Sequence, residues 1–310
     1  MIYTLTLNPA LDYSVTVPDL RLGATNRVAA NEIQWGGKGV NVSRVALEFG
    51  LKTVAMGFVA GFTGKALEEG LKSLGVAVDL TWLRAGDTRV NIKLLAQEET
   101  EINALGPPVE PEAITALIAK LSVIKAGDWL VLAGNVPPTV PVDIYQRIMA
   151  QLADQDVKIA LDTSGEPLGL ALPKRPYVIK PNSQELRDLV GLTVDSESDI
   201  VHSAQKAQSL GARNVLVSMA KEGSILLTES QEVFRVWPVI GQAKNSAGAG
   251  DSLLTGFLAG RVAGLSWAES LRLGAAAGSA TAFSPTLATK KEIEALAPSV
   301  KVSDLTKNYY

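Results

Sequence analysis

Residues 128–163 read "DWLVLAGNVPPTVPVDIYQRIMAQLADQDVKIALDT", and this stretch decides the fold. Its two ends, "DWLVLAG" and "KIALDT", are short and almost wholly apolar, as in strands that are buried on both faces. Between them, "VDIYQRIMAQLADQD" repeats apolar residues at the spacing of a helix. A buried strand, a helix and a second buried strand in succession are typical of a parallel sheet that helices cover on both sides. The stretch therefore predicts an α/β fold.

The same alternation continues over most of the 310 residues. Further strands are predicted at 2–8, 53–60, 177–181 and 214–220, and helices at 38–50, 63–75, 199–211, 248–264, 266–283 and 289–297. We therefore expect one doubly wound, mainly parallel sheet flanked by helices, in a single domain that spans residues 1–310.

Some segments lack the pattern of buried parallel strands. Residues 12–20, "DYSVTVPDL", alternate apolar and polar side chains as a half-exposed strand does. Residues 88–105 have the pattern of two strands joined by a polar turn at 97–100. Together with residues 27–36, we expect them to form a small separate β-sheet, a lid over one edge of the main domain. The alternative is that they are edge strands of the main sheet.

The composition excludes several classes of function. A net charge of −3 argues against nucleic acid or an anionic membrane as the main partner. The chain has no cysteine, and its one histidine, His202, leaves room for a Ser-His-Asp triad only if His202 is the base. The N-terminus lacks the pattern of a signal peptide, and no apolar run approaches the roughly 20 residues of a membrane span. We expect a soluble, cytoplasmic protein.

The loops that follow the strands carry the candidate functional residues, because open doubly wound sheets bind ligands beyond the carboxyl ends of their strands. "GGKGVNVSR" (36–44) brings Gly36, Gly37 and Lys38 to a helix start, which suits a polar or anionic ligand. Its spacing is neither that of a P-loop nor G-x-G-x-x-G, and a structural turn is the alternative. Asp12, after the first strand, either accepts hydrogen bonds from two sugar hydroxyls or is a turn residue.

A second glycine turn, "GAGD" (248–251), also precedes a predicted helix. Gly248, Ala249 and Gly250 can present consecutive amide groups to an anion. Asp251, in the first turn, can then accept the proton of an attacking hydroxyl during phosphoryl transfer. The alternative is an acid that pairs with the helix dipole.

A third motif, "KPNSQE" (180–185), places Asn182 and Glu185 on one face of a helix start. An amide and a carboxylate there suit a water-coordinated Mg²⁺ and phosphate oxygens, but the same pair forms a capping box. Arg89 and Arg27 are each able to bind a phosphate through bidentate contacts. A solvated surface position is the alternative for either arginine.

The motifs occur in one order along the chain. They are "TLNPALD" (6–12), "GGKGVNVSR" (36–44), "TRVNIK" (88–93), "KPNSQE" (180–185), "VSMAKEG" (217–223) and "NSAGAGDS" (245–252). This order resembles the PfkB (ribokinase-like) carbohydrate kinase family, as far as about residue 297. The combination "TLNPALD … GDTRVNIK … ETEIN … GP" further resembles its sugar-phosphate kinase branch, which includes 1-phosphofructokinase, tagatose-6-phosphate kinase and the minor 6-phosphofructokinase. Within that branch the motifs are most similar to 1-phosphofructokinase.

The resemblance implies a ribokinase-like fold and a role for each motif. The family's catalytic base falls on Asp251, and its anion hole on the amides of Ala249, Gly250 and Asp251, with Gly248 allowing the turn. The family's sugar-binding residues fall on Asp12, Gly36, Gly37 and Asn41, and the residues that bind the sugar's phosphate fall on Arg89, Lys38 and Arg27. The ATP-binding residues fall on Lys180, Asn182, Ser218, Gly223, Gly250 and Ser279. The residue that binds Mg²⁺ through water falls on Glu185.

The reaction that the resemblance implies is ATP- and Mg²⁺-dependent phosphorylation of a ketohexose phosphate, foremost of fructose 1-phosphate to fructose 1,6-bisphosphate. The alternatives are tagatose-6-phosphate kinase and the minor 6-phosphofructokinase. More remote are a non-catalytic sugar-phosphate-binding regulator and an oxidoreductase, although no G-x-G-x-x-G follows the first strand. Lids of this branch often pair, which implies a homodimer. Trp35, Asn135 and Ala247 depart from the family's pattern, and the first two border the implied sugar site.

Overall fold

The computed structural model describes residues 1–244 and 246–309, which form two separate β-sheets. Within that part of the chain the large sheet has ten strands, in the order β14-β13-β12-β11-β10-β9-β8-β1-β4-β5. Their bounds are β1 (Ile2–Thr6), β4 (Thr53–Val59), β5 (Ala77–Trp82), β8 (Trp129–Ala133), β9 (Lys158–Asp162), β10 (Val178–Ile179), β11 (Asn214–Ser218), β12 (Ser224–Leu227), β13 (Val233–Val236) and β14 (Val302–Asp304). Neighbours from β11 to β5 are parallel, and β12, β13 and β14 are antiparallel additions. The prediction of a mainly parallel sheet is confirmed.

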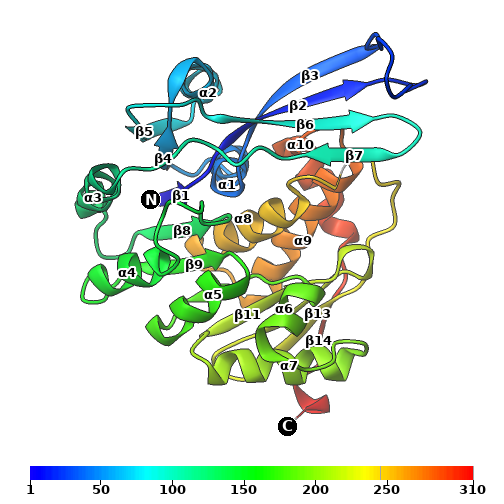
Figure 1. Ribbon diagram of the computed structural model, residues 1–310. Helices are drawn as coiled ribbons and strands as arrows, with labels where there is room; N and C mark the ends of the chain where they lie inside the picture. Colours follow the sequence, from blue (N-terminus) through cyan, green and yellow to red (C-terminus); the bar gives the residue numbers. More distant parts are fainter. Residues whose placement is uncertain (245, 310) are drawn as a thin grey trace.

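Helices cover both faces of the large sheet (Figure 1). Side chains of β8 alternate between the faces: Leu130 and Leu132 enter one core cluster, and Trp129 and Val131 enter the other. The first cluster packs on α3 (Pro111–Lys120), α4 (Ile144–Gln151), α5 (Gly165–Ala171), α6 (Ser183–Val190) and α7 (Glu197–Ser209); the opposite face packs on α1 (Lys38–Glu48), α2 (Gly61–Ser73), α8 (Ala249–Val262), α9 (Trp267–Phe283) and α10 (Lys290–Leu296). The helices are therefore held by apolar burial on both sides of the sheet.

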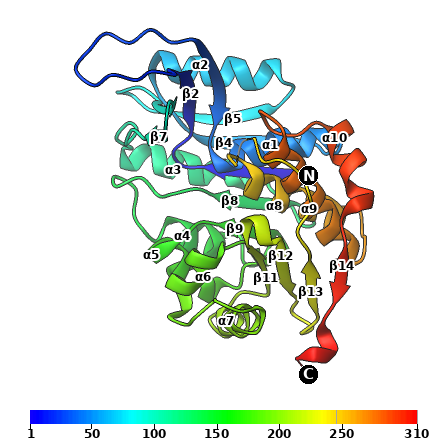
Figure 2. The same cartoon turned by 90° about the vertical axis from the view of Figure 1, so that its right-hand side faces the viewer.

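The small sheet is built from the segments that break the α/β pattern. Its order is β3-β2-β6-β7, with β2 (Ala10–Thr16), β3 (Ala30–Gly36), β6 (Arg89–Leu95) and β7 (Glu99–Ile102). Figure 2 shows its strands and the long connection between β2 and β3 at one end of the molecule. The expected separate sheet is confirmed, and the alternative of edge strands in the main sheet is wrong.

The carboxyl ends of the central parallel strands meet at one edge of the large sheet. β1 ends at Thr6, β9 at Asp162 and β10 at Ile179, and the loops that follow carry most of the predicted motifs. The turn into α1 requires glycine, because Gly37 has φ +119° and a Cβ there would lie 2.9 Å from the Thr6 methyl group. None of the helices in the described residues is long and apolar enough to cross a membrane.

Candidate active site

A cavity of about 350 Å³ opens at this edge, next to the small sheet. Its lining residues come from segments far apart in the sequence: Thr6, Asn8, Gly37, Lys38, Asn41, Arg89, Gly134, Asn135, Thr163, Ser164, Glu185 and Asp251. The structure thus brings together Gly37, Lys38, Asn41, Arg89, Glu185 and Asp251 from the predicted set, and it also places Asn135 at the cavity. Several lining residues follow the carboxyl ends of strands, as expected for an open parallel sheet.

Asp251 lies in the first turn of α8, and its side chain reaches the cavity. Gly248 caps the helix with φ +76°, a left-handed conformation that glycine adopts without strain. Asp251 is 6% exposed, and the Asn41 amide donates a 2.8 Å hydrogen bond to its Oδ2. The predicted carboxylate is thus held in a fixed orientation at the positive end of a helix dipole.

The electrostatic environment of Asp251 suits a proton acceptor. Burial, together with the negative charge of Asp162, raises the pKa of Asp251 to about 6, against the Asn41 hydrogen bond and the charges of Lys180 and Lys38. A carboxylate with a pKa of about 6 is mostly ionised at neutral pH and is more basic than an exposed one. Asp251 therefore combines the charge state and the basicity that a general base needs.

Asp162, the last residue of β9, organises the positive charges of the site. Lys38 Nζ lies 3.0 Å from Asp162 Oδ1, and Lys180 Nζ lies 3.3 Å from Oδ2. Burial disfavours the ionised carboxyl, but the two ammonium groups outweigh it and lower the pKa of Asp162. For Lys38 the neighbouring Asp162 likewise outweighs burial and raises the pKa. Asp162 is not among the residues predicted from the sequence, although an acid at the carboxyl end of a parallel strand is a usable signal.

Asp12 lies on β2 of the small sheet and faces the backbone of β3. Gly36 has to be glycine, because a Cβ there would lie 1.9 Å from Asp12 Oδ2. The Asn91 amide donates a 2.9 Å hydrogen bond to Asp12 Oδ1. Burial raises the pKa of Asp12 despite this hydrogen bond and the nearby charge of Arg89. Asn91 was not predicted from the sequence. Its hydrogen bond orients Asp12, the residue predicted to bind the sugar.

The two predicted phosphate-binding arginines lie in different places. Arg89, at the start of β6, lines the cavity, and its Nε donates a 3.1 Å hydrogen bond to the Asn8 carbonyl. Arg27 is exposed in the connection between β2 and β3, beyond the end of β2 that is remote from Gly36, and it does not line the cavity of its own chain. Of the two, only Arg89 is positioned to contact a ligand in this cavity.

Comparison with known proteins adds to this geometry. The model of the family described as "pfkB family carbohydrate kinase" matches residues 6–293 of this chain.

The chain belongs to the pfkB family of carbohydrate kinases.

Three relatives of this pfkB kinase cover almost the whole chain. The 1-phosphofructokinase of Bacillus subtilis is 40% identical over 305 residues, which are 98% of this chain and 100% of the relative. The D-tagatose-1-phosphate kinase of Bacillus licheniformis is 34% identical over 306 residues, with 98% and 100% coverage. The crystal structure of phosphofructokinase-2 from Escherichia coli in complex with substrates and products is 28% identical, with a TM-score of 0.91 and coverage of 96% and 98%. This similarity agrees with the observed fold.

The motif at the start of α6 in this pfkB kinase is a capping box. Asn182 Oδ1 accepts a 2.8 Å hydrogen bond from the Glu185 amide, and Glu185 Oε2 accepts a 2.9 Å hydrogen bond from the Asn182 amide. The alternative considered from the sequence is thus present, and Glu185 also lines the cavity. The pair therefore has a structural role that does not depend on any metal.

The other predicted ATP-binding residues lie on elements around the same edge of the sheet. Lys180 directly follows β10, and Ser218 is the last residue of β11. Ser218 also forms an isolated β-bridge with Asn182. Gly223 lies in the turn between β11 and β12, with φ +91°. Ser279 is half-buried in α9. Its neighbour Gly278 packs against the start of α8, since a Cβ on Gly278 would lie 3.0 Å from the Ala249 carbonyl oxygen. None of these four residues lines the cavity of about 350 Å³.

The predicted anion hole lies at the start of α8, beside Lys180. A Cβ on Gly250 would lie 3.2 Å from Lys180 Nζ, so this lysine lies beside the first helical turn. The Ala249 amide donates a 3.3 Å hydrogen bond to the Ser246 carbonyl, so the turn itself uses one of the expected anion donors. Asn245, the first residue of the motif, lies outside the described residues.

Two departures from the family's pattern have different surroundings. Asn135 lines the cavity, as expected for a residue that borders the sugar. Trp35 instead packs over α2, so closely that a Cβ on Gly70 would lie 2.1 Å from Trp35 Cε2. Trp35 does not line the cavity. Trp35 therefore joins β3 to α2 and does not contribute to the wall of the cavity.

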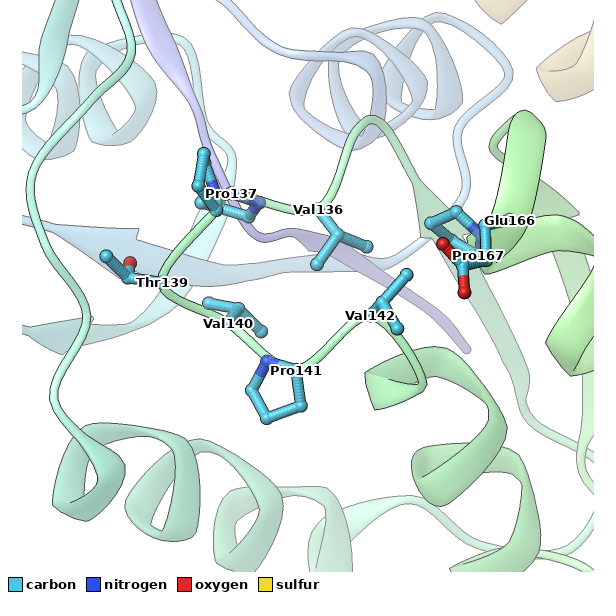
Figure 3. Close-up of a pocket in the computed structure, with 9 residues that line it drawn as sticks. Val136, Pro137, Thr139, Val140, Pro141, Val142, Glu166 and Pro167 are labelled. Atoms are coloured by element: carbon cyan, nitrogen blue, oxygen red, sulfur yellow. The ribbon is translucent and has the colours of Figure 1, made fainter.

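A second cavity of about 520 Å³ lies beside the first, and Figure 3 shows its lining side chains. Val136, Val140 and Val142 and the neighbouring prolines make it mostly apolar, with Glu166 at one side. These side chains offer a ligand few hydrogen-bonding groups. The polar cavity that contains Asp251 is therefore the candidate active site.

Proposed function

We propose that this kinase transfers the γ-phosphoryl group of ATP to the free primary hydroxyl of a ketohexose 1-phosphate, with fructose 1-phosphate as the preferred substrate. The observation that carries the proposal is that Asp251, a base, and Arg89, a phosphate-binding cation, line the same cavity. A sugar phosphate whose phosphate binds Arg89 is able to present its other end to Asp251. The relatives that are named as kinases of 1-phosphate sugars support this choice.

In the proposed mechanism, Asp251 removes the proton of the sugar hydroxyl as its oxygen attacks the γ-phosphorus. The new bond joins this oxygen to phosphorus, the bond between the γ-phosphorus and the bridging oxygen breaks, and ADP leaves. The amide groups at the start of α8 and the Lys38 and Lys180 ammonium groups balance the negative charge of the transferring group. Asp12 and Asn41 hold sugar hydroxyls, and the small sheet acts as a lid that excludes water.

The residues present fit Mg²⁺ that arrives with ATP. No cluster of three or more acidic, histidine or cysteine side chains that could hold a metal ion occurs in the described part of the chain. Glu185 lines the cavity, whereas the buried Asp162 carboxylate already pairs with Lys38 and Lys180 and does not line it. Mg²⁺ keeps several waters and uses one or two carboxylates plus substrate phosphates, so Glu185, acting through water, suffices. When bound, Mg²⁺ would neutralise phosphate charge.

D-tagatose 1-phosphate is the second candidate substrate, because a relative named D-tagatose-1-phosphate kinase is 34% identical over 98% of this chain. The two sugars differ in configuration at one carbon, so the choice depends on individual hydrogen bonds to hydroxyl groups. Asn135, which lines the cavity, is suited to make such a bond.

The cytoplasmic location expected from the sequence stays a prediction.

A substrate panel tests the proposed function. ADP formation by the purified protein with Mg²⁺ and ATP should give a kcat/KM for fructose 1-phosphate at least about tenfold above those for tagatose 1-phosphate, fructose 6-phosphate and tagatose 6-phosphate, since the site's hydrogen bonds discriminate between them. A higher value for either 6-phosphate would contradict the proposal. Binding of a sugar phosphate without any turnover would point to the regulator considered from the sequence.

We further propose a homodimer through the small sheet. Ile33, Tyr13, Ile92 and Ile102 lie directly opposite one another across its four strands and form one apolar row. The three isoleucines are 51%, 36% and 57% exposed, in chain order. Apolar rows of this kind are usually covered by a partner.

Ile92→Lys tests this dimer, because a buried ammonium in the apolar row should prevent association. Size-exclusion chromatography with light scattering should show a dimer for the natural protein and a monomer for the variant. Val123→Lys, an equivalent change at an exposed apolar residue outside the small sheet, is the control and should remain dimeric. A natural protein that elutes as a monomer at every concentration would refute the dimer.

A further inference from the structure

The segment 104–106 returns from the small sheet towards the main domain and lies against the loop that follows β1. Asn8, in that loop, is 4% exposed and lines the cavity. Its Nδ2 donates a 2.9 Å hydrogen bond to the Leu105 carbonyl. One buried amide thus links the small sheet to the main domain at the wall of the active site.

Gly106 makes this close contact possible. Its φ of +91° is a conformation that side chains disfavour, and a Cβ there would lie 2.3 Å from Asn8 Oδ1. The segment therefore passes directly over the Asn8 amide, with no space between them for a side chain. Both partners, the asparagine and the glycine, are adapted to one close fit.

This contact determines where Arg89 is held. Arg89 Nε donates a 3.1 Å hydrogen bond to the Asn8 carbonyl, and Nη1 donates a 3.4 Å hydrogen bond to the Ala104 carbonyl. One acceptor belongs to Asn8 itself, and the other belongs to the segment that the Asn8 side chain holds. The guanidinium carries further N–H groups, which are available to a phosphate.

We propose that Asn8 is a positioning residue for recognition of the sugar phosphate. By holding segment 104–106 through the Leu105 carbonyl, its side chain keeps the Ala104 and Asn8 carbonyls on either side of the Arg89 guanidinium. Arg89 then meets the phosphate in a prepared orientation, so less side-chain freedom is lost on binding. This inference rests on the proposed role of Arg89 as the phosphate ligand.

A double-mutant cycle tests the proposal through the KM for fructose 1-phosphate. Asn8→Ala should raise this KM about three- to tenfold, the effect of one lost hydrogen bond, and leave kcat and the KM for ATP within about twofold. Arg89→Ala should raise it on the order of 50-fold, because contacts to a charged phosphate are lost. Asn8→Ala in the Arg89→Ala background should then have no further effect.

Asn214→Ala is the matched control, because its buried amide also donates to a carbonyl, that of Tyr177, at 2.7 Å but at the start of β11. It should lower thermal stability and leave the KM for fructose 1-phosphate unchanged. Asn8→Leu has a side chain of similar size, adds no charge and cannot donate to the Leu105 carbonyl, and it should reproduce the rise in KM if Asn8→Ala fails to fold.

The outcomes separate this inference from the proposed function. An unchanged KM in both Asn8 variants, or an equal rise in KM with and without Arg89, would overturn the positioning role of Asn8. An unchanged KM in Arg89→Ala would instead refute the phosphate-binding role of Arg89 in the proposed function.

Discussion

Asp251→Asn should lower kcat for phosphorylation of fructose 1-phosphate by about 10³-fold, while the KM values for both substrates change little. Asparagine has the shape of aspartate but cannot accept the proton of the attacking hydroxyl. The buried carboxylate lies at the start of α8 with Asn41 2.8 Å from its Oδ2, so the substitution leaves its surroundings in place. Steady-state kinetics with both substrates varied measures the effect.

The pH profile of the natural enzyme provides an independent check on the same group. Because the pKa of Asp251 in the free enzyme is raised to about 6 and the ionised form accepts the proton, kcat/KM should fall as the pH is lowered through about 6. The residual activity of Asp251→Asn should lack this inflection. Asp188→Asn, at an exposed acid on α6, is the control and should match the natural enzyme. Turnover by Asp251→Asn within tenfold of the natural rate would contradict the role of the carboxylate as base.

Asp162→Asn should have the largest effect on stability, a loss of about 3 kcal/mol in the free energy of unfolding. Asp162 is 1% exposed and pairs with two ammonium groups, and that of Lys180 is itself 6% exposed. Without the carboxylate, two positive charges remain close together with no counter-charge. The melting temperature should fall by roughly 5 °C, as expected for a chain of this size.

The sign of the pH dependence follows from the lowered pKa of Asp162 in the folded protein. A depressed carboxyl pKa stabilises the fold above the pKa of the unfolded chain, and this contribution is lost as the pH falls through the folded value. Asp162→Asn should therefore be destabilised at neutral pH and lose less stability than the natural protein on acidification. Thermal unfolding without ligands, monitored by circular dichroism at pH 7 and at steps below pH 4, measures both effects.

An exposed ion pair offers the control for this substitution. Asp195 lies 2.7 Å from Arg187, and its side chain is 72% exposed. Asp195→Asn should not shift the melting temperature measurably, because solvent screens such a pair. Equal melting temperatures for Asp162→Asn and Asp195→Asn would show that the buried charge cluster does not stabilise the fold.

The α/β architecture was predictable because buried parallel strands have a distinct sequence pattern. "DWLVLAG" and "KIALDT" correspond to β8 and β9, with α4 between them, and these strands pair in parallel. The antiparallel additions β12, β13 and β14 were not predicted, since strands this short have little periodicity. The separate small sheet was predictable because its alternating segments do not suit a sheet buried on both faces.

The site was predictable only in part, because short motifs have two local explanations each. Asn182 and Glu185 do form the capping box that their spacing permits, and the same Glu185 lines the cavity. Gly37 is a structural requirement of a turn and a wall of the cavity at once. Local and functional interpretations were therefore not exclusive, and spacing alone had no means of separating them.

By itself, the sequence determined the fold class, the order of the motifs and Asp251 as the candidate base, because periodicity and glycine turns are local properties. Only the tertiary structure decided which polar and charged groups meet: Asp162 with Lys38 and Lys180, Asn91 with Asp12, and Asn8 with Arg89 through segment 104–106. It also separated Arg89, at the cavity, from Arg27, in an exposed connection. A contact such as that of Lys38 with Asp162, 124 positions away, depends on how strands are ordered in space, and no local pattern encodes that order.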